Sequence, residues 1–378
     1  MSTHAPLTSE QLRTVMRGFR MAGDFVAAAP YGNGHINDSF AVVYNQAGVN
    51  VRYLAQRINQ RVFPDVAGLM SNVERVCTHA QSRLETGGVS DASRRALTLI
   101  PTREGKAYFI DVDGGCWRTY LFIENATGHD VVKSEKLAYE AAKAFGEFQK
   151  LLVDLPGGRL NETIRNFHQT ETRYAAFEAA LKENSHARAE EADEEIQFAL
   201  RHRSLASSLL DLMRSGKIPE RPTHNDTKLN NVLMDDATQT AVCVIDLDTL
   251  MPGLSLYDFG DLVRTSTSPA VEDEQDLSKV RMRPEMFDAL ARGYLESAAS
   301  FLNGDEIKNL PLGGMVITYE CGLRFLTDYL RGDTYFKIKR PLHNLERCRT
   351  QFTLMDSMSE QWEALEKRIE ELAFECST

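Results

Sequence analysis

Apolar and polar residues alternate with the period of β-strands in the first third of the chain. Runs at 25–29, 39–44 and 51–58 show this alternation, and turns rich in glycine and asparagine separate them. The pattern predicts a small antiparallel meander.

A helix and two more strands are expected after the meander. Leu69, Val73, Val76 and Ala80 recur on one face of the stretch 65–84, which is the spacing of an amphipathic helix. Strand patterns follow at 107–112 and 117–123, and the turn between them contains two glycines.

Beyond residue 125 the pattern changes to helical periodicity. Long helices are expected at 134–152, 171–182, about 190–213, 284–301, 312–330 and 357–374. The sequence therefore predicts an α+β protein with two lobes: a small antiparallel β lobe with one helix over residues 1–123, and a larger, mostly helical lobe over residues 124–378. A length of 378 residues agrees with this division, because single cores stop growing at about 250–300 residues.

Composition and charge narrow the classes of partner. The net charge of −11 argues against a nucleic-acid partner or an anionic membrane surface. The acidity is uneven, since residues 1–123 hold 13 basic and 10 acidic side chains and are mildly positive. The six cysteines are scattered, as expected for reduced thiols in a cytoplasmic protein, and no apolar run approaches the length of a membrane span. The sequence leaves the oligomeric state open.

The chemistry-bearing residues gather in the stretch 223–234 and in the apolar strand 241–248 that follows it. Asp226 and Asn231 stand five residues apart in a polar loop, and Asp246 ends the next strand. Phosphoryl transfer needs a carboxylate for the acceptor hydroxyl, oxygen ligands for Mg²⁺ and cations against the phosphate charge. With Lys228, this loop supplies all three.

The pattern His-x-Asp-x-x-x-x-Asn followed by a strand that ends in Asp resembles the choline kinases and aminoglycoside phosphotransferases, relatives of the protein kinases. The resemblance implies a protein-kinase-like fold with ATP and Mg²⁺ as cofactors and a small-molecule acceptor. By that resemblance Asp226 is the catalytic carboxylate and Lys228 contacts the transferred phosphate. Asn231 and Asp246 are the expected Mg²⁺ ligands.

A second aspartate motif, 257–260, looks like the Asp-Phe-Gly of protein kinases, but it opens a helical stretch instead of ending a strand. Asp258 and Asp261 are therefore expected to support the catalytic loop together with His224. Asp248 is expected either to orient Asp246 or to face the metal as a second oxygen ligand.

The nucleotide site is expected in the first lobe. The turn Gly32, Asn33, Gly34 would lie over the phosphates, because glycine lets a backbone approach closely. The region lacks a lysine on the expected strand, so Arg57, paired with Glu74, is assigned to the phosphates. By position alone, Glu124 and Asn125 form the hinge that bonds adenine.

The fullest resemblance is to N-acetylhexosamine 1-kinase-like sugar kinases, over segments 31–38, 56–59, 72–76, 223–232, 245–264 and 324–336. It implies that Arg324 and Tyr335 reach the sugar, and His35 and Asn37 could add hydrogen bonds. The acceptor would then be the anomeric hydroxyl of an N-acetylhexosamine or related sugar.

Other functions stay open. The same chemistry could act on an amino alcohol, an aminoglycoside or homoserine, and a pseudokinase would bind nucleotide without turnover. A protein kinase is disfavoured, because no Ala-Pro-Glu motif closes an activation segment between Asp246 and Pro284.

Overall fold

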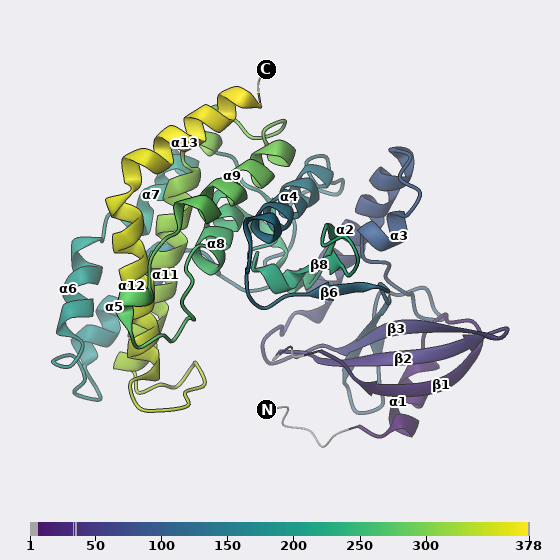
Figure 1. The fold of residues 1–378 in the computed structure, drawn as a ribbon. Helices are drawn as coiled ribbons and strands as arrows, with labels where there is room; N and C mark the ends of the chain where they lie inside the picture. The colour runs from purple at the N-terminus through teal and green to yellow at the C-terminus, as the bar shows by residue number, and fades with distance from the viewer. Residues whose placement is uncertain (1–6, 33, 35, 377–378) are drawn as a thin grey trace.

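The computed structural model describes residues 7–32, 34 and 36–376, and it has the expected two lobes (Figure 1). The first lobe is built on a five-stranded antiparallel sheet of order β1-β2-β3-β5-β4. Its strands are β1 (Asp24–Pro30), β2 (Asp38–Gln46), β3 (Val49–Arg57), β4 (Phe109–Ile110) and β5 (Cys116–Leu121).

Strand alternation gives this sheet two packed faces. Phe40, Val42 and Tyr44 of β2 lie on one face and pack against α1 (Ser9–Met16), which opens with a capping box at Thr8. Helix α2 (Val66–Thr86) follows β3 and buries its apolar face, including Val73, in the main core. The short helix α3 (Ala92–Arg95) comes after α2.

The second lobe is mostly helical, as expected. Its helices are α4 (Glu135–Leu151), α5 (Thr170–Glu183), α6 (Asp193–Arg201), α7 (Leu205–Arg214), α8 (Ser255–Ser266), α9 (Pro284–Ala298), α10 (Gly304–Lys308), α11 (Leu310–Leu330), α12 (His343–Glu360) and α13 (Trp362–Glu375). α11 runs through the centre of the lobe and packs against α5, α8 and α12 (Figure 1). Within the described ranges, no helix is both long and apolar enough to cross a membrane.

Two small sheets hold the loops that matter for function. β6 (Ala126–Gly128), β8 (Val232–Asp235) and β9 (Ala241–Val244) form one, and β7 (Arg221–Thr223) pairs with β10 (Met251–Gly253) in the other. The chain between β7 and β8 and the residues after β9 are thereby brought together.

The expected α+β class, with a sheet lobe and a helical lobe, is observed, but two helix predictions were wrong in extent. The stretch 190–213 is two helices, α6 and α7, with a turn at 202–204. The stretch 357–374 likewise contains a break at Gln361, and the preceding helix α12 begins as early as His343.

Candidate active site

Hydrogen bonds to Asp258 of α8 fix the backbone of the loop between β7 and β8. The buried carboxylate of Asp258 accepts hydrogen bonds from the backbone N–H groups of His224 (3.0 Å) and Asn225 (2.7 Å) and from the side chain of Gln149 (2.5 Å). The hydroxyl of Thr227 donates to the backbone carbonyl of Asp258 (2.5 Å). Motif 257–260 is thus helical, and its aspartate supports the loop.

His224 connects this loop to the residues after β9. Its Nε2 lies 2.9 Å from the carbonyl oxygen of Ile245, and its Nδ1 accepts from the N–H of Asp226 at 3.3 Å. Because Nδ1 accepts, the proton is on Nε2. The fully buried imidazole fixes the backbone on both sides of the site.

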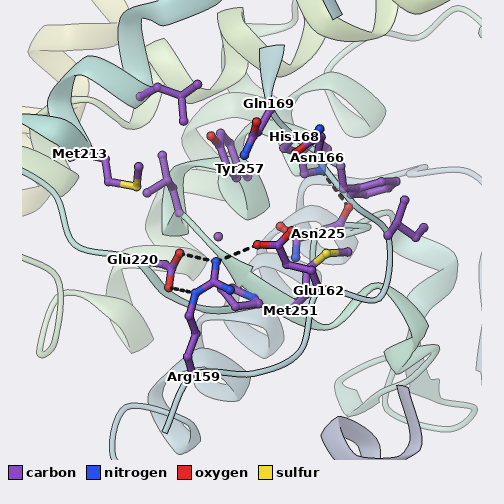
Figure 2. Close-up of a pocket in the computed structure, with 16 residues that line it drawn as sticks. Arg159, Glu162, Asn166, His168, Gln169, Met213, Glu220, Asn225, Met251 and Tyr257 are labelled. Atoms are coloured by element: carbon purple, nitrogen blue, oxygen red, sulfur yellow. Dashed lines mark hydrogen bonds and ion pairs between the residues drawn. The ribbon is translucent and has the colours of Figure 1, made fainter. Parts of the chain in front are cut away.

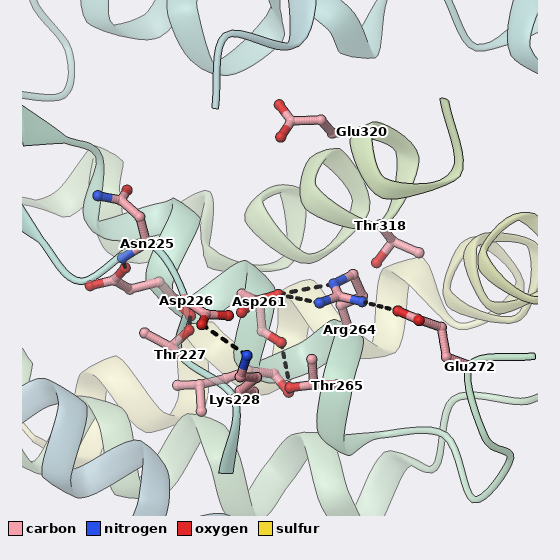
Figure 3. A network of polar contacts seen from close by, with 12 residues as sticks. Asn225, Asp226, Thr227, Lys228, Asp261, Arg264, Thr265, Glu272, Thr318 and Glu320 are labelled. Carbon is pink, nitrogen blue, oxygen red and sulfur yellow. Dashed lines mark hydrogen bonds and ion pairs between the residues drawn. The ribbon is translucent and has the colours of Figure 1, made fainter. Parts of the chain in front are cut away.

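Asp226 lies between a cation and an amide. Its Oδ2 is 2.9 Å from Nζ of Lys228 (Figure 3). The same oxygen accepts a hydrogen bond from Asn231 at 3.0 Å. Burial by itself would raise the pKa of Asp226, but the charge and hydrogen bond of Lys228 hold it below the ordinary value. Asp226 is therefore ionised at neutral pH and can accept a proton.

Asp246 and Asn231 are neighbours through the backbone, since the N–H of Ile245 donates to the carbonyl of Asn231 at 2.9 Å. Asp246 has a left-handed φ of 60°, an uncommon conformation for a residue other than glycine. Its side chain is exposed to solvent and has no hydrogen bond or ion pair within the described ranges. Enclosure by protein and the charges of Asp248 and Asp226 raise its pKa to about 6.

These residues fit a Mg²⁺ ion. The Oδ1 of Asn231 accepts no hydrogen bond from described residues, so Asn231 and Asp246 can both offer oxygen ligands to a metal. A bound cation would also relieve the repulsion among the carboxylates. The described part of the chain contains no group of three or more His, Cys, Asp or Glu suited to a metal. Mg²⁺ commonly takes one or two protein ligands and completes its shell with phosphates and water.

Asp248 was expected to orient Asp246 or to face the metal, but the structure places it elsewhere. It is buried, and its two carboxylate oxygens bond to Arg118 of β5 and to Asn37 of the first lobe (2.6 Å). The Oδ1 of Asn37 also accepts from the N–H of Asn59 at 2.9 Å. Asp248 therefore joins the two lobes, and Asn37, expected at the sugar, has both ends of its amide engaged there.

The expected ion pair between Arg57 and Glu74 is absent, and that prediction was wrong. Glu74 is exposed, because it does not lie on the buried apolar face of α2, which includes Val73 and Val76. The buried cation of the first lobe is Arg118, whose Nε donates to Gln56 at 3.0 Å. Arg57 has Gln56 as its neighbour in β3 and pairs across the sheet with Asp38 and Trp117.

The hinge residues are held by two arginines. The exposed Glu124 forms a bidentate ion pair with Arg52, which keeps its pKa low. Arg94 donates to the carbonyl of Asn125 at 3.1 Å and to Asp235 at 2.8 Å. The carbonyl of Asn125 therefore already has a partner.

The glycine turn is described only in part. Gly32 has φ +80°, and a Cβ on Gly34 would meet nothing within 4 Å. No packing within the described structure thus requires glycine at position 34, which leaves approach of a ligand as a reason for it. The predictions for Asn33 and His35 lie outside the described residues.

Arg324 and Tyr335 lie at the other side of the catalytic loop. Tyr335 is 74% exposed, and Arg324 of α11 is half-buried one turn after Glu320. Glu320 contacts His168 (2.8 Å), whose other nitrogen lies 3.1 Å from the carbonyl oxygen of Asn225. One imidazole ring therefore separates this cluster from the residue that precedes Asp226.

A small pocket lies next to the loop, on the side of Asn225 (Figure 2). It is lined by Arg159, His168 and Tyr257, among others, and its cavity volume is about 80 Å³. That is smaller than the roughly 300 Å³ at which ligand pockets begin. This pocket has no room for a nucleotide or a sugar.

Three residues at the site were missed by sequence analysis: Arg118, His168 and Arg173. Arg118 had a signal, because it is a lone cation in the otherwise uncharged strand Cys116–Leu121, where a charge is buried only if it has a partner. His168 and Arg173 had none, since the residues of α11 near them, Glu320 and Arg324, come about 150 residues later.

Comparison with known proteins places the fold. Residues 27–301 match the phosphotransferase enzyme family. An aminoglycoside phosphotransferase from Alicyclobacillus acidocaldarius superposes with a TM-score of 0.62 at 12% identity, covering 98% of both chains. An ethanolamine kinase from Plasmodium vivax gives 0.56 at 13% identity over 93% of this chain and 92% of that one. A choline kinase from Cryptosporidium parvum gives 0.51 at 15% identity over 97% and 99%.

The structural likeness establishes the bilobal kinase fold, and the sequence match covers well over half of the chain. Kinases of this family use ATP with Mg²⁺. The chain belongs to the phosphotransferase enzyme family.

Proposed function

We propose that this protein transfers the γ-phosphate of ATP to a hydroxyl group of a small sugar, with the anomeric hydroxyl of an N-acetylhexosamine or a related sugar as the leading acceptor. The observation that carries the proposal is the ionised Asp226, held by Lys228 and Asn231 beside the exposed carboxylate of Asp246. A carboxylate, a cation and free oxygen ligands in one loop are the groups that phosphoryl transfer uses.

In this proposal Asp226 takes the hydroxyl proton of the acceptor while that oxygen bonds to the γ-phosphorus and ADP leaves. Lys228 keeps Asp226 ionised and offers a positive charge to the transferred phosphate. Asn231 and Asp246 would hold Mg²⁺, which neutralises phosphate charge when it is bound.

The first lobe supports a nucleotide in several ways. Gly32 and Gly34 leave open space at the turn that precedes β2. The aromatic ring of Phe122 lies at the hinge, 5.1 Å from Tyr31 between ring centroids. Because the carbonyls of Glu124 (3.4 Å) and Asn125 (3.1 Å) both accept from Arg94, we assign adenine recognition to the carbonyl of Ile123 and the N–H of Glu124.

The assignment to a sugar depends on Arg324 and Tyr335, the two residues that the resemblance to sugar kinases brings to the acceptor. The exposed ring of Tyr335 is available as an aromatic wall, and Arg324 has no ion-pair partner within the described chain. The amino-alcohol, aminoglycoside and homoserine acceptors are the alternatives, and the names of the similar solved structures are of those first two kinds.

Replacing Asp226 with Asn tests the chemistry. The variant should fold, bind ADP and lose about 10²- to 10⁴-fold in kcat, because the amide cannot accept the hydroxyl proton. Release of ADP, measured over a panel of sugars, amino alcohols and aminoglycosides, gives the rate and identifies the acceptor.

The matched control is Asp236→Asn, an exposed aspartate in the turn after β8. It should leave kcat unchanged. A folded Asp226→Asn protein with near-normal turnover contradicts the assignment. Absence of Mg²⁺-dependent ADP release with every acceptor favours the pseudokinase alternative instead.

A further inference from the structure

The helical lobe holds two arginines whose charge is not fully balanced by neighbouring acids. Arg324 on α11 has no hydrogen bond or ion pair with any residue of the described ranges, and its nearest aromatic neighbour is Phe336, with the guanidinium carbon 5.5 Å from the ring centroid. Arg173, in the first turn of α5, donates from one NH₂ group to the carbonyl of Phe167 at 2.9 Å. Its Nε is buried and has no partner.

These two arginines lie on helices that pack together, since Thr170, three residues before Arg173 on α5, donates to Glu320, four residues before Arg324 on α11. Burial lowers the pKa of Arg173, and the positive charge of Arg324 lowers it further. Two unpaired cations in a half-buried position are unfavourable unless an anion compensates them.

The nearest acid compensates these charges only in part. Glu320 is one helical turn before Arg324 and lies within electrostatic range of both arginines, but its carboxylate is bonded to His168 at 2.8 Å and to the hydroxyl of Thr170 at 2.7 Å and forms an ion pair with neither arginine. Burial would raise the pKa of Glu320, yet His168, and to a smaller extent Arg324, keep it low, so one negative charge is shared among the histidine and the two arginines.

The acids farther along the same network are also paired. Asp261 bonds Arg264 at 2.8 Å, and Glu272 lies 3.5 Å from Arg264 (Figure 3). Glu272 also lies 3.7 Å from Arg347. Arg173 and Arg324 are therefore the arginines of this network that form no ion pair in the described ranges.

These two arginines lie on the acceptor side of the catalytic loop. His168 bridges Glu320 to the carbonyl of Asn225, the residue before Asp226. The phenol of Tyr335 also lies within electrostatic range of Arg173. An acceptor that packs against Tyr335 would therefore have Arg173 and Arg324 beside it.

We propose that the acceptor carries an acidic group, a carboxylate or a phosphate, that binds between Arg173 and Arg324. The proposal rests on the proposed kinase function and names the class of its substrate: a sugar acid or a sugar phosphate. Guanidinium groups bind both oxyanions through paired hydrogen bonds. The same two charges would repel choline, ethanolamine and aminoglycosides, which are cations at neutral pH.

The preference for an acidic group is tested with acceptors that differ only in the substituent at one carbon of the sugar. Glucose, glucuronate and glucose 6-phosphate form one series, and N-acetylglucosamine with its 6-phosphate forms another. An acidic member should exceed its neutral counterpart at least about 10-fold in kcat/KM, measured by ADP release. The glucuronate and phosphate arms distinguish the two sources of negative charge.

The variants Arg173→Met and Arg324→Met should each lower kcat/KM for the preferred acidic acceptor by about 10- to 100-fold, mostly through KM. Arg173→Met should change the neutral counterpart by less than about threefold, whereas Arg324→Met should also lower kcat/KM for the neutral sugar, because Arg324 reaches the sugar in the proposed function. Lys182→Met removes an exposed charge from the same helix, α5, and should change neither. Thermal unfolding verifies that each variant is folded.

The outcomes separate the two proposals. Preference for neutral sugars, or an acidic acceptor indifferent to both arginine variants, overturns this inference and leaves the sugar-kinase function standing. If no sugar is phosphorylated, calorimetric titration of glucuronate and glucose 6-phosphate into the ADP-bound protein still decides: binding lost in the arginine variants supports the acidic site, and equal binding overturns it.

Discussion

At the scale of single residues, the buried Arg118 is the one whose loss should cost the most stability. Its guanidinium pairs with Asp248 with almost no access to solvent. Arg118→Met leaves that carboxylate with only Asn37, and an unpaired buried charge costs about 3–5 kcal/mol. Urea unfolding should show a loss of this size.

Arg13→Met is the control for this change. Arg13 and Glu10 form an exposed pair 3.7 Å apart, and such pairs contribute less than about 1 kcal/mol. Equal destabilisation by the two variants would contradict the role assigned to Arg118.

The pair formed by His168 and Glu320 predicts how stability changes with pH. Burial disfavours the charged histidine, but Glu320 raises its pKa above the ordinary 6.5, while the pKa of Glu320 is held below 4.5. The histidine's contribution is complete below pH 6.5 and is lost as pH rises through the raised value. The glutamate's contribution is complete above pH 4.5.

Wild type should therefore exceed His168→Gln in free energy of unfolding most between pH 4.5 and 6.5, by about 1–3 kcal/mol. The difference should shrink by pH 9. Urea unfolding of both proteins at pH 6 and pH 9 measures it, and a difference independent of pH would show that His168 is neutral.

At the residue scale, sequence can group the residues of a site where they are contiguous. Asp226, Lys228 and Asn231 fall within six residues, so their spacing could be recognised in the sequence, and the structure places Lys228 and Asn231 each within about 3 Å of Asp226. Arg118 and Asp248 are 130 residues apart, and nothing in either local sequence names the other. The pairing predicted between Arg57 and Glu74 was wrong for a similar reason, because the local sequence does not show how α2 is oriented against the sheet and so which of its faces is exposed.

At the scale of elements, the loop after α11 depends on one aspartate. The buried carboxylate of Asp328 accepts hydrogen bonds from the N–H groups of Thr334 (3.0 Å), Tyr335 (2.8 Å) and Phe336 (2.9 Å), and from the side chain of Asn344 (2.9 Å). Both carboxylate oxygens are used, so the position of Tyr335 is fixed from α11.

Asp328→Asn should loosen this loop, because the amide offers one acceptor oxygen in place of two. We expect KM for the acceptor to rise about 5- to 50-fold while KM for ATP stays within about twofold. Hydrogen exchange at 334–336 should accelerate. Asp305→Asn in α10 is the control, and a parallel rise in both KM values would point to general destabilisation.

Elements were predicted well where a periodic face is long and less well where a tertiary contact ends it. The helix expected at 357–374 breaks at Gln361, whose side chain donates to the carbonyls of Met282 (3.1 Å) and Ser357 (3.0 Å). Met282 comes from a distant segment, so the local pattern does not show the break. The short strands β6, β7 and β10 were missed because three residues carry too little periodicity.

At the scale of the whole molecule, the amide of Asn37 joins the lobes at Asp248. It follows the glycine turn directly, and it also fixes the backbone of Asn59. If that turn covers the phosphates, a turn that has lost the Asn37 bridge must be ordered when the nucleotide binds. The free energy needed to order it then lowers the affinity for the nucleotide.

Asn37→Ala should therefore weaken Mg²⁺-ADP binding by about 10- to 150-fold in calorimetric titration, the equivalent of one hydrogen bond to a charged group. Asn50→Ala, at the far end of the same sheet, should bind as wild type does. The sequence alone assigns Asn37 to the acceptor and predicts the opposite pattern: a raised acceptor KM with unchanged ADP affinity. Because the structure has both ends of this amide bonded between the lobes, an unchanged dissociation constant for ADP would contradict the bridge and favour the acceptor contact instead.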